Sequence, residues 1–125
     1  GASWREMTGP EAPEGVVRSS RPALAYAPDG VLALLWRGYH ADGSYDMYMV
    51  AARDGEGFGT ARRISQAPSL VPEGLMKDYS SGGDFISSLG AGTDTLHAAW
   101  TGWRTGEAGQ VFHARVPLTA LLPER

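Results

Sequence analysis

The segment 31–37 (Val-Leu-Ala-Leu-Leu-Trp-Arg) decides the fold, because its apolar residues run without interruption up to a closing arginine. A run of this length is short for a buried helix and suits a strand that is buried on both faces. The turn sequence Pro28-Asp29-Gly30 precedes it, and the apolar segment 45–52 follows it after a polar loop. This order of turn, strand, loop and strand predicts an antiparallel meander.

The same pattern of short apolar segments and turns extends over most of the chain. The 17 glycines and 8 prolines among 125 residues favour many short strands joined by tight turns over long helices. The predicted class is therefore all-β. The predicted strands are residues 21–27, 31–37, 45–52, 58–65, 84–89, 95–101 and 110–116, and a tail follows at 117–125 with one turn of helix.

Two halves of the chain repeat at an offset of 64 residues. The matched pairs are Leu32 with Leu96, Trp36 with Trp100, Tyr39 with Trp103, and Tyr48 with Phe112. A meander of three or four strands cannot bury its faces alone, so such units stack on one another. Stacked four-stranded antiparallel meanders predict β-propeller blades, and a small β-sandwich is the alternative.

The repeat also divides the chain into expected parts. We expect residues 1–18 to form the outer strand of a preceding blade, at 3–6, followed by a linker. The expected parts after it are a blade at 19–65, a long inter-blade loop at 66–83, a second blade at 84–116 and a tail at 117–125.

Several of these segments resemble the sialidase-like family of β-propellers, whose blades carry BNR or Asp-box repeats. Residues 21–36 resemble the first two strands of such a blade, and 83–116 resemble the closing blade. Residues 45–58 are similar to a third strand that runs into an Asp-box, usually Ser-x-Asp-x-Gly-x-Thr-Trp, although Ala52 stands at the Ser position and Phe58 falls one residue early. The resemblance spans residues 19–116.

The resemblance implies a six-bladed propeller in a full family member and a secreted or periplasmic location. It does not imply sialidase activity, because the arginines, the Tyr/Glu pair and the Asp acid/base of a sialidase have no assignable positions in this chain.

Composition excludes several classes of function. The net charge is −3 and the 11 basic residues are scattered, so no nucleic-acid footprint exists. The absence of cysteine excludes thiol catalysis, disulfides and Cys-based zinc sites. No apolar run is long enough for a transmembrane helix, and the first residues lack the features of a signal peptide. We expect no nucleic-acid or membrane partner and no cofactor.

Topology directs attention to one rim of the predicted blades. The loops between second and third strands, and the loops between blades, share a rim in a propeller, and here they carry acids, arginines and aromatics that suit a sugar or a protein surface. The predicted ligand-binding residues are Arg37, Tyr39, His40, Asp42, Trp103, Arg104 and Glu107. For the two arginines the alternative is stacking on a neighbouring aromatic ring.

The sequence indicates catalytic residues less strongly than ligand-binding residues. Asp78, Tyr79 and Asp84 are weak catalytic candidates, because paired carboxylates can hydrolyse a glycoside. The alternatives are loop capping by Asp84 and packing by Tyr79. No metal site is predicted, since His97 and His113 can face each other across a hairpin but two histidines make a poor zinc site.

Three functions follow from these expectations. The first is a propeller segment that binds carbohydrate or protein, the second is a fragment of a glycosidase, and the third is a set of purely structural closing blades. Two blades leave two sheet faces for neighbours, so we expect a fragment of a longer chain, self-association, with three copies giving a six-bladed ring, or closure as a sandwich.

Overall fold

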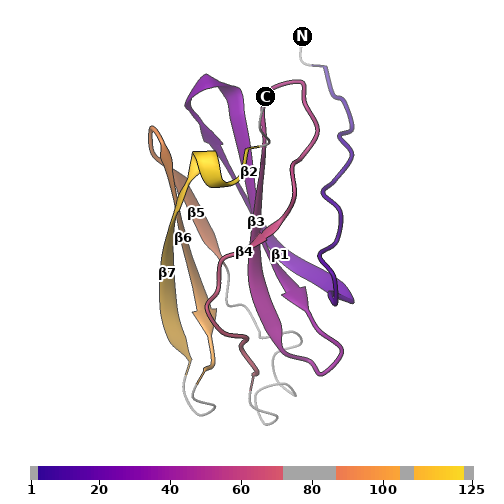
Figure 1. The fold of residues 1–125 in the computed structure, drawn as a ribbon, viewed down its shortest axis with the longest axis vertical. Helices are drawn as coiled ribbons and strands as arrows, with labels where there is room; N and C mark the ends of the chain where they lie inside the picture. Colours follow the sequence, from indigo (N-terminus) through magenta and orange to yellow (C-terminus); the bar gives the residue numbers. More distant parts are fainter. Residues whose placement is uncertain (1–2, 72–86, 105–108, 123–125) are drawn as a thin grey trace.

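The computed structural model describes residues 3–71, 87–104 and 109–122, and this part of the chain is all-β (Figure 1). It forms two antiparallel sheets, which we call sheet A and sheet B. Sheet A has the order β1 (Arg18–Ala27), β2 (Val31–Tyr39), β3 (Tyr45–Ala52) and β4 (Arg62–Arg63), and sheet B has the order β5 (Ser88–Ala91), β6 (Thr95–Gly102) and β7 (Gln110–Pro117). Two short 3₁₀ turns, η1 (Pro28–Gly30) and η2 (Leu118–Ala120), complete the structure.

Each predicted segment from residue 21 onward contains a strand in the structure, but the strand ends differ from the predicted ones. The segment 45–52 matches β3, while β2 runs two residues past its predicted end to Tyr39. The segment 58–65 shrinks to the two residues of β4, although the Gly59 amide donates to the Ala51 carbonyl and the side chains of Phe58 and Ala61 pack onto sheet A. Residues 3–6, predicted as a strand of a preceding blade, form no strand.

The turn between β1 and β2 explains why the chain reverses here. Ala27 pairs with Val31, so Pro28–Gly30 close the hairpin. Asp29 and Gly30 have φ angles of 65° and 75°, in the left-handed region that Asp tolerates and Gly adopts without steric cost. The turn sequence thus sets the register in which β2 pairs with the second half of β1.

The core lies between the two sheets. The inner face of sheet A, which we define as the face toward sheet B, buries Ala33, Leu35, Met47, Met49 and Ala51. Sheet B contributes its own apolar face to the same cluster, namely Leu96, Ala98 and Trp100, with Phe112, Ala114 and Val116 packed around them. Burial of this aliphatic and aromatic surface is the main source of stability.

The repeat reappears in three dimensions as two matching aromatic pairs. Trp36 stacks on Tyr48 with ring centroids 6.0 Å apart and an interplanar angle of 28°, and Trp100 stacks on Phe112 at 6.1 Å and 26°. The two pairs lie on equivalent faces of their sheets, but those faces have different surroundings. Trp36 and Tyr48 belong to a cluster on the outer face of sheet A, whereas Trp100 belongs to the core between the sheets.

This placement gives the direction of stacking. If the two sheets met face to face, as two halves related by a two-fold axis would, both tryptophans would point into one core. Instead, the face of sheet B that carries Trp100 packs on the face of sheet A that does not carry Trp36. The sheets are therefore stacked face to back, in the same sense.

Each aromatic pair depends on a glycine at the same place in the repeat. A Cβ atom at Gly38 would lie 2.6 Å from the Tyr48 ring and 2.9 Å from a Val16 methyl. A Cβ atom at Gly102 would lie 2.9 Å from the Phe112 ring and 2.6 Å from the Ser69 hydroxyl. Both glycines, predicted as loop residues, belong to a strand in the structure, Gly38 one residue before the end of β2 and Gly102 at the end of β6, and each leaves room for a cross-strand ring.

We expect Gly38→Ala and Gly102→Ala each to lower the free energy of unfolding by about 1–3 kcal/mol, because the new methyl group overpacks an aromatic ring. Gly90→Ala is the matched control, since nothing lies within 4 Å of a Cβ at this strand position. Urea denaturation of the three variants measures the difference. Equal stability of all three would contradict the role of the glycines.

Candidate functional site

One end of the molecule, which we call the loop end, holds most of the predicted site residues. The β2–β3 hairpin and the adjoining ends of β6 and β7 lie together at the bottom of Figure 1, and the turns at 28–30 and 92–94 lie at the opposite end. The Tyr45 hydroxyl donates to the Thr101 carbonyl at 2.6 Å, and the Leu70 amide donates to the Trp103 carbonyl at 3.2 Å. These bonds tie both sheets together at the loop end.

The predicted residues divide into those that the structure describes and those that it does not. Arg37, Tyr39, His40, Asp42, Trp103 and Arg104 all lie at the loop end. Four other predictions fall outside the described residues, namely Asp78, Tyr79, Asp84 and Glu107.

Two guanidinium groups flank a pair of tyrosine rings beneath the loop end. Arg18 lies over the Tyr39 ring at 4.2 Å from its centroid, Tyr39 contacts Tyr45 at a centroid distance of 5.5 Å, and Arg37 lies over Tyr45 at 4.6 Å. Each cation rests on the electron-rich face of its ring. Burial raises the pKa of Tyr45 above its ordinary value, and the charge of Arg37 acts in the opposite direction.

The members of this stack differ in how far they are exposed to solvent, and this difference indicates which of them can contact a ligand. Arg37 and Tyr39 are 0% and 3% exposed, so they lie beneath the surface where the sequence pattern placed ligand contacts. Arg18 begins β1 and is exposed. The buried pair therefore supports the site from below, and Arg18 is the member of the stack that reaches solvent.

Arg104 forms a similar contact on sheet B. Its guanidinium lies 4.0 Å from the centroid of the Phe112 ring, and the residue is exposed. Its neighbour Trp103 is buried at 3% exposure within the core cluster. Stacking, which was the alternative interpretation of Arg104, is thus present, and it holds an exposed guanidinium in a fixed place.

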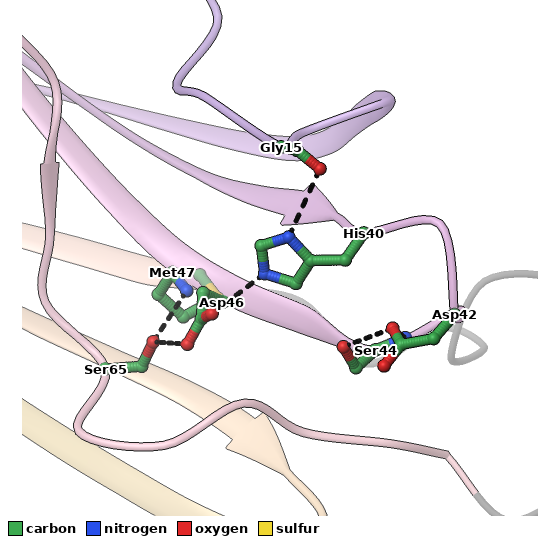
Figure 2. Close-up of polar contacts among 7 residues, drawn as sticks. All are labelled: Gly15, His40, Asp42, Ser44, Asp46, Met47 and Ser65. Carbon is green, nitrogen blue, oxygen red and sulfur yellow. Dashed lines mark hydrogen bonds and ion pairs between the residues drawn. The ribbon is translucent and has the colours of Figure 1, made fainter.

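A buried carboxylate organises the start of β3 (Figure 2). Asp46 is 3% exposed, and its two oxygens have separate partners. Oδ2 accepts from His40 Nε2 at 2.8 Å, and Oδ1 accepts from the Ser65 hydroxyl at 2.6 Å. Ser65 Oγ in turn accepts from the Met47 amide at 3.0 Å, while His40 Nδ1 lies 3.4 Å from the Gly15 carbonyl oxygen.

This network contains the residue types of a hydrolase triad, but in the wrong order. A nucleophilic serine must donate to the histidine, which the carboxylate orients from the other side. Here the serine donates to the carboxylate and lies buried beside the Met47 amide. The network is therefore structural, and it joins the β2–β3 hairpin to segments that are far away in sequence.

We expect Asp46→Ala to lower the free energy of unfolding by about 3 kcal/mol, because it removes two charge-assisted hydrogen bonds in a buried site. Asp54→Ala, an exposed turn position, is the control and should change stability by less than about 0.5 kcal/mol. Thermal and urea denaturation measure both variants. An Asp46→Ala variant as stable as the control would show that the network does not hold the hairpin.

The hairpin loop itself is rigid for reasons that its sequence explains. Asp42 Oδ1 accepts from the Ser44 amide at 2.9 Å and from the Ser44 hydroxyl at 2.6 Å. The hydroxyl bond is the main cause that lowers the pKa of Asp42 below its ordinary value. The His40 amide donates to the Ser44 carbonyl at 2.8 Å, and Gly43 between them has a φ of 85°. Asp42 thus stays exposed and ionised at the tip.

Two residues of the loop end, Arg18 and Asp46, were missed in the sequence. Arg18 lies opposite Tyr39 because a bulge between Ser20 and Ala23 shifts the register of β1. Counting back from the turn without the bulge places a different residue there. Asp46 did give a signal, as a lone acid within an otherwise apolar strand.

In the ranges 3–71, 87–104 and 109–122, no three His, Asp or Glu side chains lie close enough together to hold a metal ion. Within those ranges, no helix has the length and apolar character needed to cross a membrane.

Comparison with protein-family models, curated proteins and solved structures found no match for this chain. The resemblance to sialidase-like repeats therefore rests on the sequence pattern quoted above, and function must be inferred from the chain's own geometry.

Proposed function

We propose that the loop end binds an acidic carbohydrate and that the two sheets are blades of a propeller-type stack. One observation carries the binding role. Two exposed arginines, Arg18 and Arg104, are each held over an aromatic ring at the end where both hairpins open.

Fixed guanidinium groups suit a carboxylate ligand for two reasons. A guanidinium presents paired N–H donors that match the two oxygens of a carboxylate. Stacking on a ring also orders the side chain before the ligand arrives, which reduces the entropy lost on binding. Since each arginine rests on its own sheet, a ligand that contacts both must lie across the end of the pair of sheets.

Asp42 supplies the complementary group. Its Oδ1 takes both hydrogen bonds from Ser44, and the exposed carboxylate can accept a further hydrogen bond from a sugar hydroxyl through Oδ2. An exposed carboxylate with exposed arginines favours a ligand that carries both hydroxyl and acidic groups. An acidic sugar has this chemistry.

Two features support propeller blades over a closed sandwich. The sheets stack face to back, as successive units of a radial array do. In addition, a groove of about 360 Å³ separates β4 from the C-terminal half of β7, so the sheets do not close on each other at that edge. A wedge of this kind is what neighbouring blades form away from their shared axis.

The glycosidase alternative depends on Asp78, Tyr79 and Asp84, which lie outside the described residues, so we advance no second function.

Calorimetric titration with sialyllactose, a glucuronate-bearing disaccharide and neutral lactose tests this proposal. We expect the acidic sugars to bind more tightly than lactose, and Arg18→Ala and Arg104→Ala each to weaken that binding about tenfold, the loss of one charge-assisted contact. Arg115→Ala is the matched control, because Arg115 is an exposed arginine on β7 whose loss should leave affinity unchanged. Equal affinity for acidic and neutral sugars, or no binding at all, would overturn the proposal.

A further inference from the structure

The outer face of sheet A is apolar and only partly covered. Phe58, Ala61 and Val16 pack over the β3 side, around Trp36, Tyr48 and Val50. The side formed by β1 and the first half of β2 remains accessible, and we call it the open face. Leu24 and Tyr26 are 63% and 72% exposed there, beside the half-buried Leu32 and Leu34.

A hollow marks the lower part of the open face. It has a volume of about 280 Å³ and its lining is mainly apolar; sheet A contributes Ser19, Ser20, Pro22, Leu34 and Trp36, and the N-terminal segment contributes residues 10–12. An exposed leucine, an exposed tyrosine and an apolar hollow on one sheet face indicate a surface made for contact.

The internal repeat identifies what contacts such a face. Leu32, Leu34 and Trp36 correspond to Leu96, Ala98 and Trp100 at the offset of 64 residues. Leu24 pairs with Leu34 as Leu89 pairs with Ala98, so Leu24 corresponds to Leu89. In sheet B these equivalents lie in the core or against it. What covers them is the inner face of sheet A, with its Ala, Leu and Met side chains.

The outer face of sheet B has a different character. Its positions His97, His113 and Arg115 correspond to Ala33, Met49 and Ala51 on the inner face of sheet A, whereas Val111, at the position of Met47, is apolar and 81% exposed. Three apolar positions of sheet A have thus become polar and solvent-exposed in sheet B. A polar outer face is typical of the last unit in a stack of repeats.

Head-to-tail association of identical copies is disfavoured by this difference. In a ring of three copies, the open face of one copy would have to pack on the polar face of the next. Burial of histidine and arginine against leucine and tyrosine without partners is unfavourable. The open face of sheet A is therefore the face of the two-sheet unit that suits a further apolar sheet.

We propose that the open face is the docking surface for a third antiparallel sheet of the same repeat, one that presents aliphatic side chains like those on the inner face of sheet A. The third sheet covers Leu24, Tyr26 and Leu34 as sheet A covers Leu89 and Ala98. This inference rests on the repeat and does not depend on the ligand of the loop end.

A three-sheet chain tests the docking directly. It consists of residues 1–86 followed by residues 18–125, so that the full chain gains one extra copy of sheet A with its own connection. Tyr26→Phe in the first copy leaves one Tyr26, on the face that the extra sheet should cover. We expect nitration of this tyrosine by tetranitromethane to be severalfold slower than in the unmodified chain.

Leu24→Lys in the second copy is the matched control. Leu24 is exposed in the two-sheet chain, so the substitution should leave the stability of that chain unchanged. In the three-sheet chain it should restore fast nitration of Tyr26, because a lysine would be buried in the new interface. Val111→Lys, on the outer face of sheet B, should leave the protection intact.

Two outcomes would overturn the proposal. One is fast nitration of Tyr26 in a monomeric three-sheet chain whose far-UV circular dichroism shows the added strand content, since the extra sheet would then be folded without covering the open face. The other is a stable dimer of the unmodified chain in sedimentation equilibrium that Leu24→Lys dissociates, since a second copy would then be the occupant of the open face.

Discussion

The rest of the structure depends on one contact, in which Trp100 and its neighbours on sheet B pack against the inner face of sheet A. The only buried cluster apart from the shared core in the described residues is the small one of Trp36, Tyr48 and Val50 on the outer face of sheet A, so each sheet must bury its larger apolar face against the other. The aliphatic side chains of β2 and β3 provide that surface for Leu96, Ala98 and Trp100. Because the two sheets are related by the repeat, this one contact also defines how any further unit would stack.

The contact also builds the loop end. Once sheet B lies on sheet A, the Tyr45 hydroxyl reaches the Thr101 carbonyl, and the loose ends of four strands are held at one place. Arg37 and Tyr39 then become buried beneath that end, and Arg18 and Arg104 are left to meet solvent. The candidate binding surface is therefore a consequence of sheet packing more than of any single loop.

The sequence predicted the strands well, but it predicted less well which side chains are buried. Segment 45–52 matched β3 because its apolar run is bounded by clear turn signals on both sides. Arg37 and Tyr39 were predicted as ligand contacts on the rim, and Gly38 between them was predicted as a loop residue. In the structure this glycine lies inside β2 and makes room for Tyr48, so the strand continues and both residues are buried. Such a contact between strands has no signature in a single sequence.

The matched positions of the repeat proved more informative than the local patterns. Trp36 with Tyr48 and Trp100 with Phe112 form the same stacked pair, as their alignment suggested. What the alignment could not give was which face of each sheet points inward. That depends on the neighbours that each unit meets, and it is why Trp36 and Trp100 have different surroundings.

The stacking direction is the central claim, and nuclear Overhauser contacts from the two tryptophan rings test it most directly. The account predicts contacts from the Trp100 ring to methyl groups of Leu35, Met47 and Met49, and contacts from the Trp36 ring to Val16 and Phe58. Contacts between the Trp36 and Trp100 rings would show that the tryptophan faces meet each other. The sheets would then form a two-fold sandwich, and the open face would have no equivalent in the core.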